Sequence, residues 1–175
     1  VLLSTCTGII SIVIAGWLLG VLGLSLVTVF TASGLRVLSG GAHSQSLRNC
    51  TLMGVIIAPA IALAAKHFHG YFSLPVMLGL VMAAALFSGW SILRYAPADT
   101  PNKPIISESY KATLRRLSMS YALLWFLLMT VLVTGFWIVT PYDVILASTL
   151  GIIWQSFSLT PLGYKLVATV DTLLP

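Results

Sequence analysis

VLLSTCTGIISIVIAGWLLGVLGLSLVTVFTASGL, residues 1–35, contains no charged side chain. One helix needs about 20 apolar residues to cross a bilayer. This run is longer than that, so it must tilt, break or turn back on itself. Glycines at positions 16, 20 and 23 either let helices pack closely or mark a bend. We expect one long span or a broken one.

The composition extends this reading to the whole chain. Hydrophobic residues make up 58% of the 175 residues and charged residues only 7%, whereas an average soluble domain has roughly 25% charged residues. The sequence therefore predicts a polytopic membrane protein in contact with a lipid bilayer. The net charge of +5 is better explained by cations at the membrane edges than by nucleic-acid binding, which we do not expect.

Further apolar segments follow the first run. They cover about residues 52–65, 71–93, 117–139 and 144–159. Thr160-Pro161 is expected to end the last of them, since proline cannot continue a helix. The tail, residues 162–175, is expected to be an interfacial helix. The prediction is a single all-α membrane domain over residues 1–175, with about five to six membrane-embedded helices.

The basic residues predict how this bundle is oriented. The polar interval 94–116 carries five of the nine lysines and arginines, so it should face the cytoplasm. Counting single crossings from it places residues 36–48 on the same side and residues 66–70 outside. Eight of the nine cations then lie inside and only Lys66 lies outside.

RVLSGGAHSQSLRNC, residues 36–50, is the most reactive-looking stretch. On a continuous helix, His43 and Cys50 would lie about 10 Å apart along the axis, too far to share a proton. A Cys-His pair needs hydrogen-bond contact. The Gly40-Gly41 pair permits a tight turn that would fold His43 back over a helix carrying Cys50. Ser44 or Ser46 is a suitable N-cap for that helix.

A helix N-terminus near Cys50, together with Arg36 or Arg48, would favour the thiolate. Both His43 and Cys50 also have a non-catalytic explanation. A cysteine at a membrane edge is often a packing residue, and an interfacial histidine is often only solvated. We expect no metal or cofactor, because the remaining histidines, at positions 67 and 69, fall on the opposite face in this topology.

Two blocks resemble the accessory gene regulator B family of membrane cysteine endopeptidases. SGGAHSQSLRNC, residues 39–50, is similar to that family's Gly-Gly-X-His turn with a cysteine seven residues later, and YAPADTPNKPI, residues 95–105, is similar to its second recurring segment. The resemblance covers nearly the whole chain. The exception is an N-terminal stretch that family members carry before the first apolar segment. This numbering does not include it, so functional residues in that stretch cannot be placed here.

The resemblance implies specific roles. Cys50 would be the nucleophile and His43 its base, and Arg36 and Gly41 would be required for activity, with Gly40 completing the turn. Family members cut a propeptide on its C-terminal side and help close the remaining segment into a thiolactone or lactone ring, the quorum-sensing autoinducing peptide. The protein would then reside in the plasma membrane of a bacterium with its catalytic loop at the cytoplasmic side.

No group that orients His43 is obvious from the sequence. Asp99 is the best acidic candidate, because it lies in the second block and on the predicted cytoplasmic side. The same residue is equally suited to capping a turn in that proline-rich segment. Glu108 is a weaker candidate.

The predicted substrate is a peptide-signal precursor with an amphipathic helix and an acidic tail. Candidate docking residues for that tail are the basic side chains Arg48, Lys111, Arg115 and Arg116. The last three are equally explained as a positive-inside anchor. The resemblance also implies a homodimer.

Two other classes of function stay open at the level of sequence. A small membrane export or binding protein could recognise a peptide through its polar loops without cutting it. A purely structural membrane subunit is the other class, and a Gly-Gly-Ala-His loop at the cytoplasmic face is hard to reconcile with it.

Overall fold

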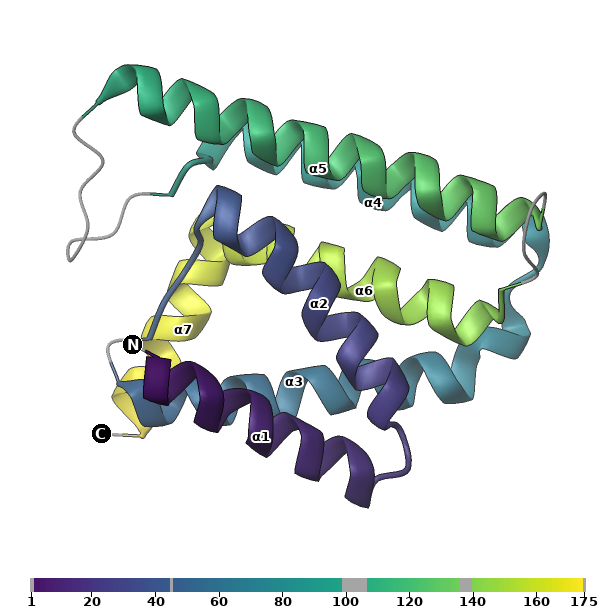
Figure 1. Ribbon diagram of the computed structural model, residues 1–175, viewed down its shortest axis with the longest axis horizontal. Coiled ribbons are helices and arrows are strands. Elements are labelled where there is room, and N and C mark those ends of the chain that lie inside the picture. The colour runs from purple at the N-terminus through teal and green to yellow at the C-terminus, as the bar shows by residue number, and fades with distance from the viewer. Residues whose placement is uncertain (1, 45, 99–106, 136–139, 175) are drawn as a thin grey trace.

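The computed structural model describes residues 2–44, 46–98, 107–135 and 140–174. These form seven α-helices and one short 3-10 helix, and no strand occurs within the described ranges. Figure 1 shows the helices packed as a bundle, with α4 and α5 lying alongside each other at one side. The expected all-α membrane architecture is confirmed.

The charge-free run is a helical hairpin and not the single long or broken helix that we expected, although its described residues hold one candidate membrane span. It forms α1, Leu2–Leu18, and α2, Leu22–Ser39, which run in opposite directions (Figure 1). Gly20 makes the reversal possible, because its φ of +64° is a conformation that favours glycine. A Cβ at Gly16 would lie 3.1 Å from Ser25 Oγ, so the hairpin is tightly packed. Of the parts of this pair that the structure describes fully, α2 alone is long and apolar enough to cross a membrane.

The next helices follow the predicted segments with shifted ends. They are α3 (Leu47–Phe68), the 3-10 helix η1 (His69–Tyr71), α4 (Leu74–Tyr95), α5 (Glu108–Thr134), α6 (Tyr142–Ser158) and α7 (Pro161–Leu173). Helix α3 begins inside the Arg36–Cys50 motif. Helix α5 begins nine residues before the predicted apolar segment, because Ser107 accepts a capping hydrogen bond from the Tyr110 N–H. The last four residues of the predicted segment 117–139, residues 136–139, lie outside the described ranges.

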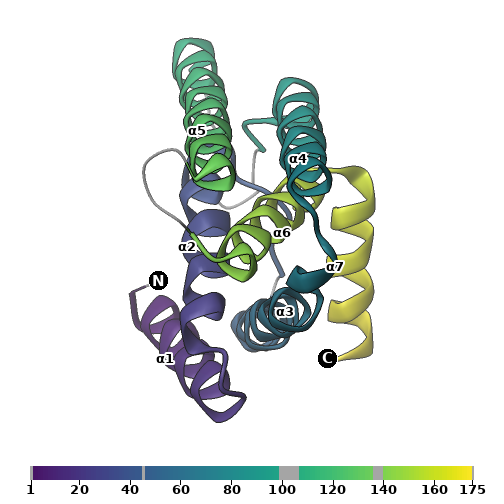
Figure 2. The ribbon, with the colours of Figure 1, turned by 90° about the vertical axis from the view of Figure 1, so that its right-hand side faces the viewer.

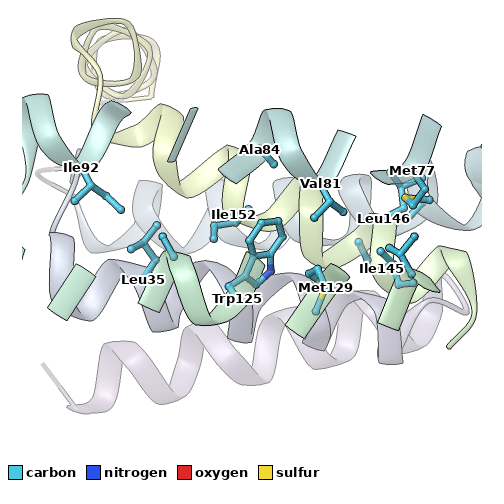
Figure 3. Packing of buried hydrophobic residues seen from close by; sticks show 14 of the residues in the cluster. Leu35, Met77, Val81, Ala84, Ile92, Trp125, Met129, Ile145, Leu146 and Ile152 are labelled. Carbon is cyan, nitrogen blue, oxygen red and sulfur yellow. The ribbon is translucent and has the colours of Figure 1, made fainter. Parts of the chain in front are cut away.

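Helix α6 is the centre of the bundle. Figure 2 shows it surrounded by α2, α3, α4, α5 and α7. Ile145, Leu146 and Ile152 of α6 pack with Trp125 and other residues of the core cluster (Figure 3). Small polar side chains are buried beside them, and Ser148 of α6 accepts a hydrogen bond from Trp125 Nε1 at 3.0 Å. Burial on all sides explains why apolar residues occur all round α6, with small polar residues between them.

Helices α6 and α7 meet at an angle of 84°, at the Thr160-Pro161 break that the sequence predicts. Among the described residues, four helices are long and apolar enough to cross a membrane, or five if the bent α6–α7 pair counts as one span. The C-terminal ends of α2, α4 and α6 gather at one end of the bundle with the N-terminal ends of α3 and α5 (Figure 1). All described lysines and arginines except Lys66 belong to that end or to α7.

Candidate active site

The Gly-Gly turn is required by both conformation and space. Helix α2 ends at Ser39, and Gly40 and Gly41 adopt φ values of +70° and +142°, which other residues rarely adopt. A Cβ at Gly40 would lie 2.6 Å from the Ala98 carbonyl oxygen, and one at Gly41 would lie 2.7 Å from Ser158 Oγ. Neither position has room for a side chain.

Hydrogen bonds hold the turn between two distant parts of the chain. The Ser39 carbonyl accepts from the Ala98 N–H at 2.8 Å, and the Ala42 N–H donates to the Ser158 carbonyl at 2.9 Å. Gln155 Nε2 of α6 donates to the Gly40 carbonyl at 2.8 Å. The turn is therefore fixed by the end of α6 on one side and by the segment after α4 on the other.

Arg36 spans the turn from the last turn of α2. Its guanidinium donates to the Ala42 carbonyl at 2.6 Å and to Gln155 Oε1 at 3.4 Å. Its charge also lies within electrostatic reach of Cys50. Arg36 thus ties the loop that carries His43 to α6 and places a positive charge near the thiol.

His43 and Cys50 meet across the junction between this loop and α3. His43 lies in extended chain and is exposed, whereas Cys50 is half-buried as the fourth residue of α3. The Cys50 N–H makes a helical hydrogen bond to the Ser46 carbonyl at 3.0 Å. Despite the seven-residue separation, their side chains lie close enough for Cys50 to be the largest influence on the pKa of His43. The loop and the first turn of α3 thus bring these two side chains together.

The hydrogen bond from Cys50 is the main reason that the pKa of His43 is raised above its usual value. Partial burial and the Arg36 charge act in the opposite direction. His43 Nδ1 is also 3.3 Å from the Ser44 carbonyl oxygen. A carbonyl only accepts, so Nδ1 carries the proton in this bond and Nε2 is the basic nitrogen.

Helix α7 adds residues that the sequence analysis missed. The Asp171 carboxylate accepts hydrogen bonds from the Ser44 hydroxyl and, at 3.1 Å, from Asn49 Nδ2. Asn49 is only 1% exposed. Its signal in the sequence was an amide directly beside the cysteine at the start of an apolar helix. Gln155 was missed as well, although it is a lone amide in an apolar run, where polar groups usually have a partner.

The predicted docking residues lie on two helices, Arg48 on α3 and the other three on α5. Lys111 pairs with Glu108 at 3.1 Å on the surface of α5, and Arg115 Nε donates to the Ala96 carbonyl at 2.8 Å. Arg116 is exposed on the same helix. Arg48, on α3, donates to the Leu174 carbonyl at 3.1 Å.

Asp99, the predicted partner of His43, lies outside the described residues. Within the described ranges, no group of three or more His, Cys, Asp and Glu side chains is arranged to hold a metal ion. His67 and His69 lie at the end of α3 and in η1, away from the end of the bundle that carries the Gly-Gly turn (Figure 1).

Comparison with known proteins identifies the family. The family model described as Accessory gene regulator B matches residues 1–159. AgrB-like proteins of two Clostridium perfringens strains are 33% and 34% identical to the chain, each covering 98% of it and 82% of the relative's length. An AgrB-like protein of Listeria welshimeri is 28% identical over 76% of the chain. No solved structure matches. Both the length of the family match and the identity to the Clostridium relatives lead to one conclusion: the chain belongs to the accessory gene regulator B family.

Proposed function

We propose that the chain is a membrane cysteine endopeptidase that cleaves a peptide-signal precursor and retains the N-terminal part of the peptide as a thioester on Cys50. Family membership supports a role in peptide quorum sensing. The observation that carries the enzymatic proposal is the proximity of the His43 and Cys50 side chains at the start of α3, where interaction with Cys50 raises the pKa of His43. Such contact between a thiol and a base is what activates a cysteine nucleophile.

The reaction would proceed in two steps. His43 Nε2 accepts the Cys50 thiol proton, and the thiolate attacks the carbonyl carbon of the scissile bond. When the C–N bond breaks, the imidazolium gives that proton to the leaving amine. An internal cysteine or serine of the peptide then attacks the thioester carbonyl. The ring closes as a thiolactone or lactone, and the Cys50 sulfur leaves and regains a proton.

The start of α3 supplies a site for the negative charge on the tetrahedral intermediate. Ser46 occupies the N-cap position and its side chain makes no capping hydrogen bond. The first backbone N–H groups of a helix have no partner within the helix. Donors of this kind, directed at the reacting carbonyl oxygen, stabilise an oxyanion. We assign this role to the first turn of α3, which carries Cys50.

Hydrolysis of the thioester would compete with ring closure, so the site must limit access of water. Cys50 is half-buried on a helix that continues into a candidate membrane span. The surrounding turn is fixed by Gln155 and Arg36. This recessed position at a membrane edge supports a peptidase whose acyl-enzyme survives long enough for the internal attack.

The basic residues at the same end of the bundle suit an acidic peptide tail. The Lys111–Glu108 pair is exposed, with side chains 34% and 86% accessible, so its mutual attraction is weak. Lys111 is therefore available to a peptide carboxylate, as is exposed Arg116. Because cytoplasmic loops of membrane proteins carry the excess of lysine and arginine, we propose that this end faces the cytoplasm of a bacterial cell.

The proposal is tested by incubating the purified protein in vesicles with a precursor peptide that has an amphipathic helix and an acidic tail. Cys50→Ala and His43→Ala should each abolish cleavage. His67→Gln is the matched control for loss of a histidine and should cleave normally. A Cys50→Ala variant that cuts at the wild-type rate rules out the mechanism. Peptide binding without cleavage by the wild type favours a binding or export protein.

A further inference from the structure

We propose that Asp171, in the last turn of α7, is a positioning residue for the His43–Cys50 pair. The inference rests on the proposed function, because it assigns a further residue to the same site. Helix α7 lies beyond the residues that the family model matches, 1–159. Its contribution follows from contacts in this structure.

Asp171 contacts the immediate neighbours of both members of the pair. Its Oδ1 accepts from the hydroxyl of Ser44, which directly follows His43, and from Nδ2 of Asn49, which directly precedes Cys50. One carboxylate oxygen therefore bridges the loop and the helix at the point where the thiol and the imidazole meet. Hydrogen bonds to an ionised acceptor are stronger than those between neutral groups.

Ser44 relays this contact to the histidine. Its carbonyl accepts from His43 Nδ1 at 3.3 Å, and its hydroxyl oxygen accepts from the Ser46 N–H at 3.1 Å. Fixing Ser44 thus fixes the ring that faces the thiol and the chain that leads into α3. Loss of the carboxylate would free the loop at the residue next to His43.

Asn49 anchors the other side of the bridge. It is 1% exposed, and its Nδ2 donates to the Leu174 carbonyl at 2.8 Å as well as to Asp171. A buried amide that loses an acceptor is destabilised. Asn49 therefore couples the C-terminal end of α7 to the turn of α3 that carries Cys50.

Positioning and simple electrostatics predict opposite effects on the thiol. Asp171 lies within electrostatic reach of Cys50, and like charges repel. If the carboxylate acted only through its charge, removing it would favour the thiolate and speed alkylation. If it holds His43 against Cys50, removing it weakens the contact that stabilises the thiolate, and alkylation slows.

The experiment measures alkylation of Cys50 by iodoacetamide as a function of pH in the full chain, read at Cys50 by peptide mass spectrometry. It compares Asp171→Ala, Asp171→Asn and the control Thr169→Ala, which alters an exposed residue of the same helix. Precursor cleavage and thermal unfolding are recorded for each variant. The asparagine variant keeps an oxygen that can accept from both Ser44 and Asn49.

We expect Asp171→Ala to slow alkylation at Cys50 and to lower kcat for cleavage by about 10- to 100-fold with little change in KM, as misplacement of reacting groups does. Asp171→Asn should retain most of both rates, and Thr169→Ala should match the wild type. A folded Asp171→Ala that is alkylated as fast as the wild type, or faster, overturns the inference. An equal loss in Asp171→Asn also overturns it.

If Asp171→Ala does not fold, Ser44→Ala replaces it, because this variant removes one of the two donors and leaves Asn49 in place. Slower alkylation supports the inference, and an unchanged rate overturns it. Failure of the proposed function is separable: a wild-type protein that never cuts the precursor refutes the peptidase, whereas the alkylation rates still decide whether Asp171 positions the pair.

Discussion

Replacing Gly41 by alanine should disable the site by forcing a methyl group into the Gly-Gly turn. The added Cβ would lie 2.7 Å from Ser158 Oγ and 3.2 Å from Gln155 Nε2, at a φ of +142°. A backbone strained in this region costs about 1–3 kcal/mol, and overpacking costs about 1–3 kcal/mol more. The turn must therefore shift, and the Gln155 and Arg36 contacts shift with it.

The size of the effect follows from these energies. If the native turn becomes less stable than a displaced one by about 2–6 kcal/mol, its population falls by about 30-fold or more, because about 1.4 kcal/mol corresponds to a factor of ten. His43 leaves its contact with Cys50 in the displaced form. We expect the rate of precursor cleavage to fall by at least that factor.

The assay is single-turnover cleavage of the precursor, with thermal unfolding measured in the same detergent. Gly79→Ala is the matched control: a Cβ there meets nothing within 4 Å, and alanine is favoured over glycine inside a helix. This control should cleave normally. A Gly41→Ala variant with the wild-type rate and stability would show that the turn tolerates a side chain and that this reasoning is wrong.

Four further predictions concern His43, Gln155 and Arg116. Cys50→Ala removes the main cause of the raised pKa of His43, so NMR titration should show that pKa falling; an unchanged value contradicts the hydrogen bond. In the wild type, the stabilising contribution of His43 should be complete below the ordinary histidine pKa and be lost as pH rises through the raised value, as unfolding across pH will show. Gln155→Ala leaves the Gly40 carbonyl without this donor, and the free energy of unfolding should fall by about 1–3 kcal/mol; full stability in denaturation contradicts that role. Arg116→Glu should raise KM for an acidic-tailed precursor without lowering kcat, and an unchanged KM removes Arg116 from docking.

The sequence predicts the local parts of the site. Gly40 and Gly41 predict a turn because no other residue adopts their backbone so readily. The seven-residue spacing rules out one continuous helix as the means of bringing His43 and Cys50 together. Ser46, one of the two predicted N-cap residues, does occupy the N-cap position of α3, although its side chain makes no capping hydrogen bond.

The sequence does not predict the contacts between distant elements. Asp171 reaches Ser44 across 127 positions, and Gln155 reaches Gly40 across 115. No sequence pattern around either residue indicates which residue it contacts. Only the packing of α6 and α7 against the loop brings these groups together.

The first two helices show a different limit. A run without charges carries no marker of where it crosses a membrane edge, so hydropathy alone could not separate a long span from a hairpin. Gly20 was a signal, but glycines also occur at close helix contacts. The positive φ of Gly20, which is visible only in the structure, shows that this glycine forms the turn of the hairpin.

The most direct test of the central claim is intact-mass analysis of the protein after acid quench of a single turnover with precursor peptide. We predict an adduct with the mass of the N-terminal part of the peptide, mapped to Cys50, released by neutral hydroxylamine and absent from Cys50→Ala. Cleaved peptide that accumulates with no adduct on Cys50 at any time point would contradict the thioester and, with it, the assignment of Cys50 as the nucleophile.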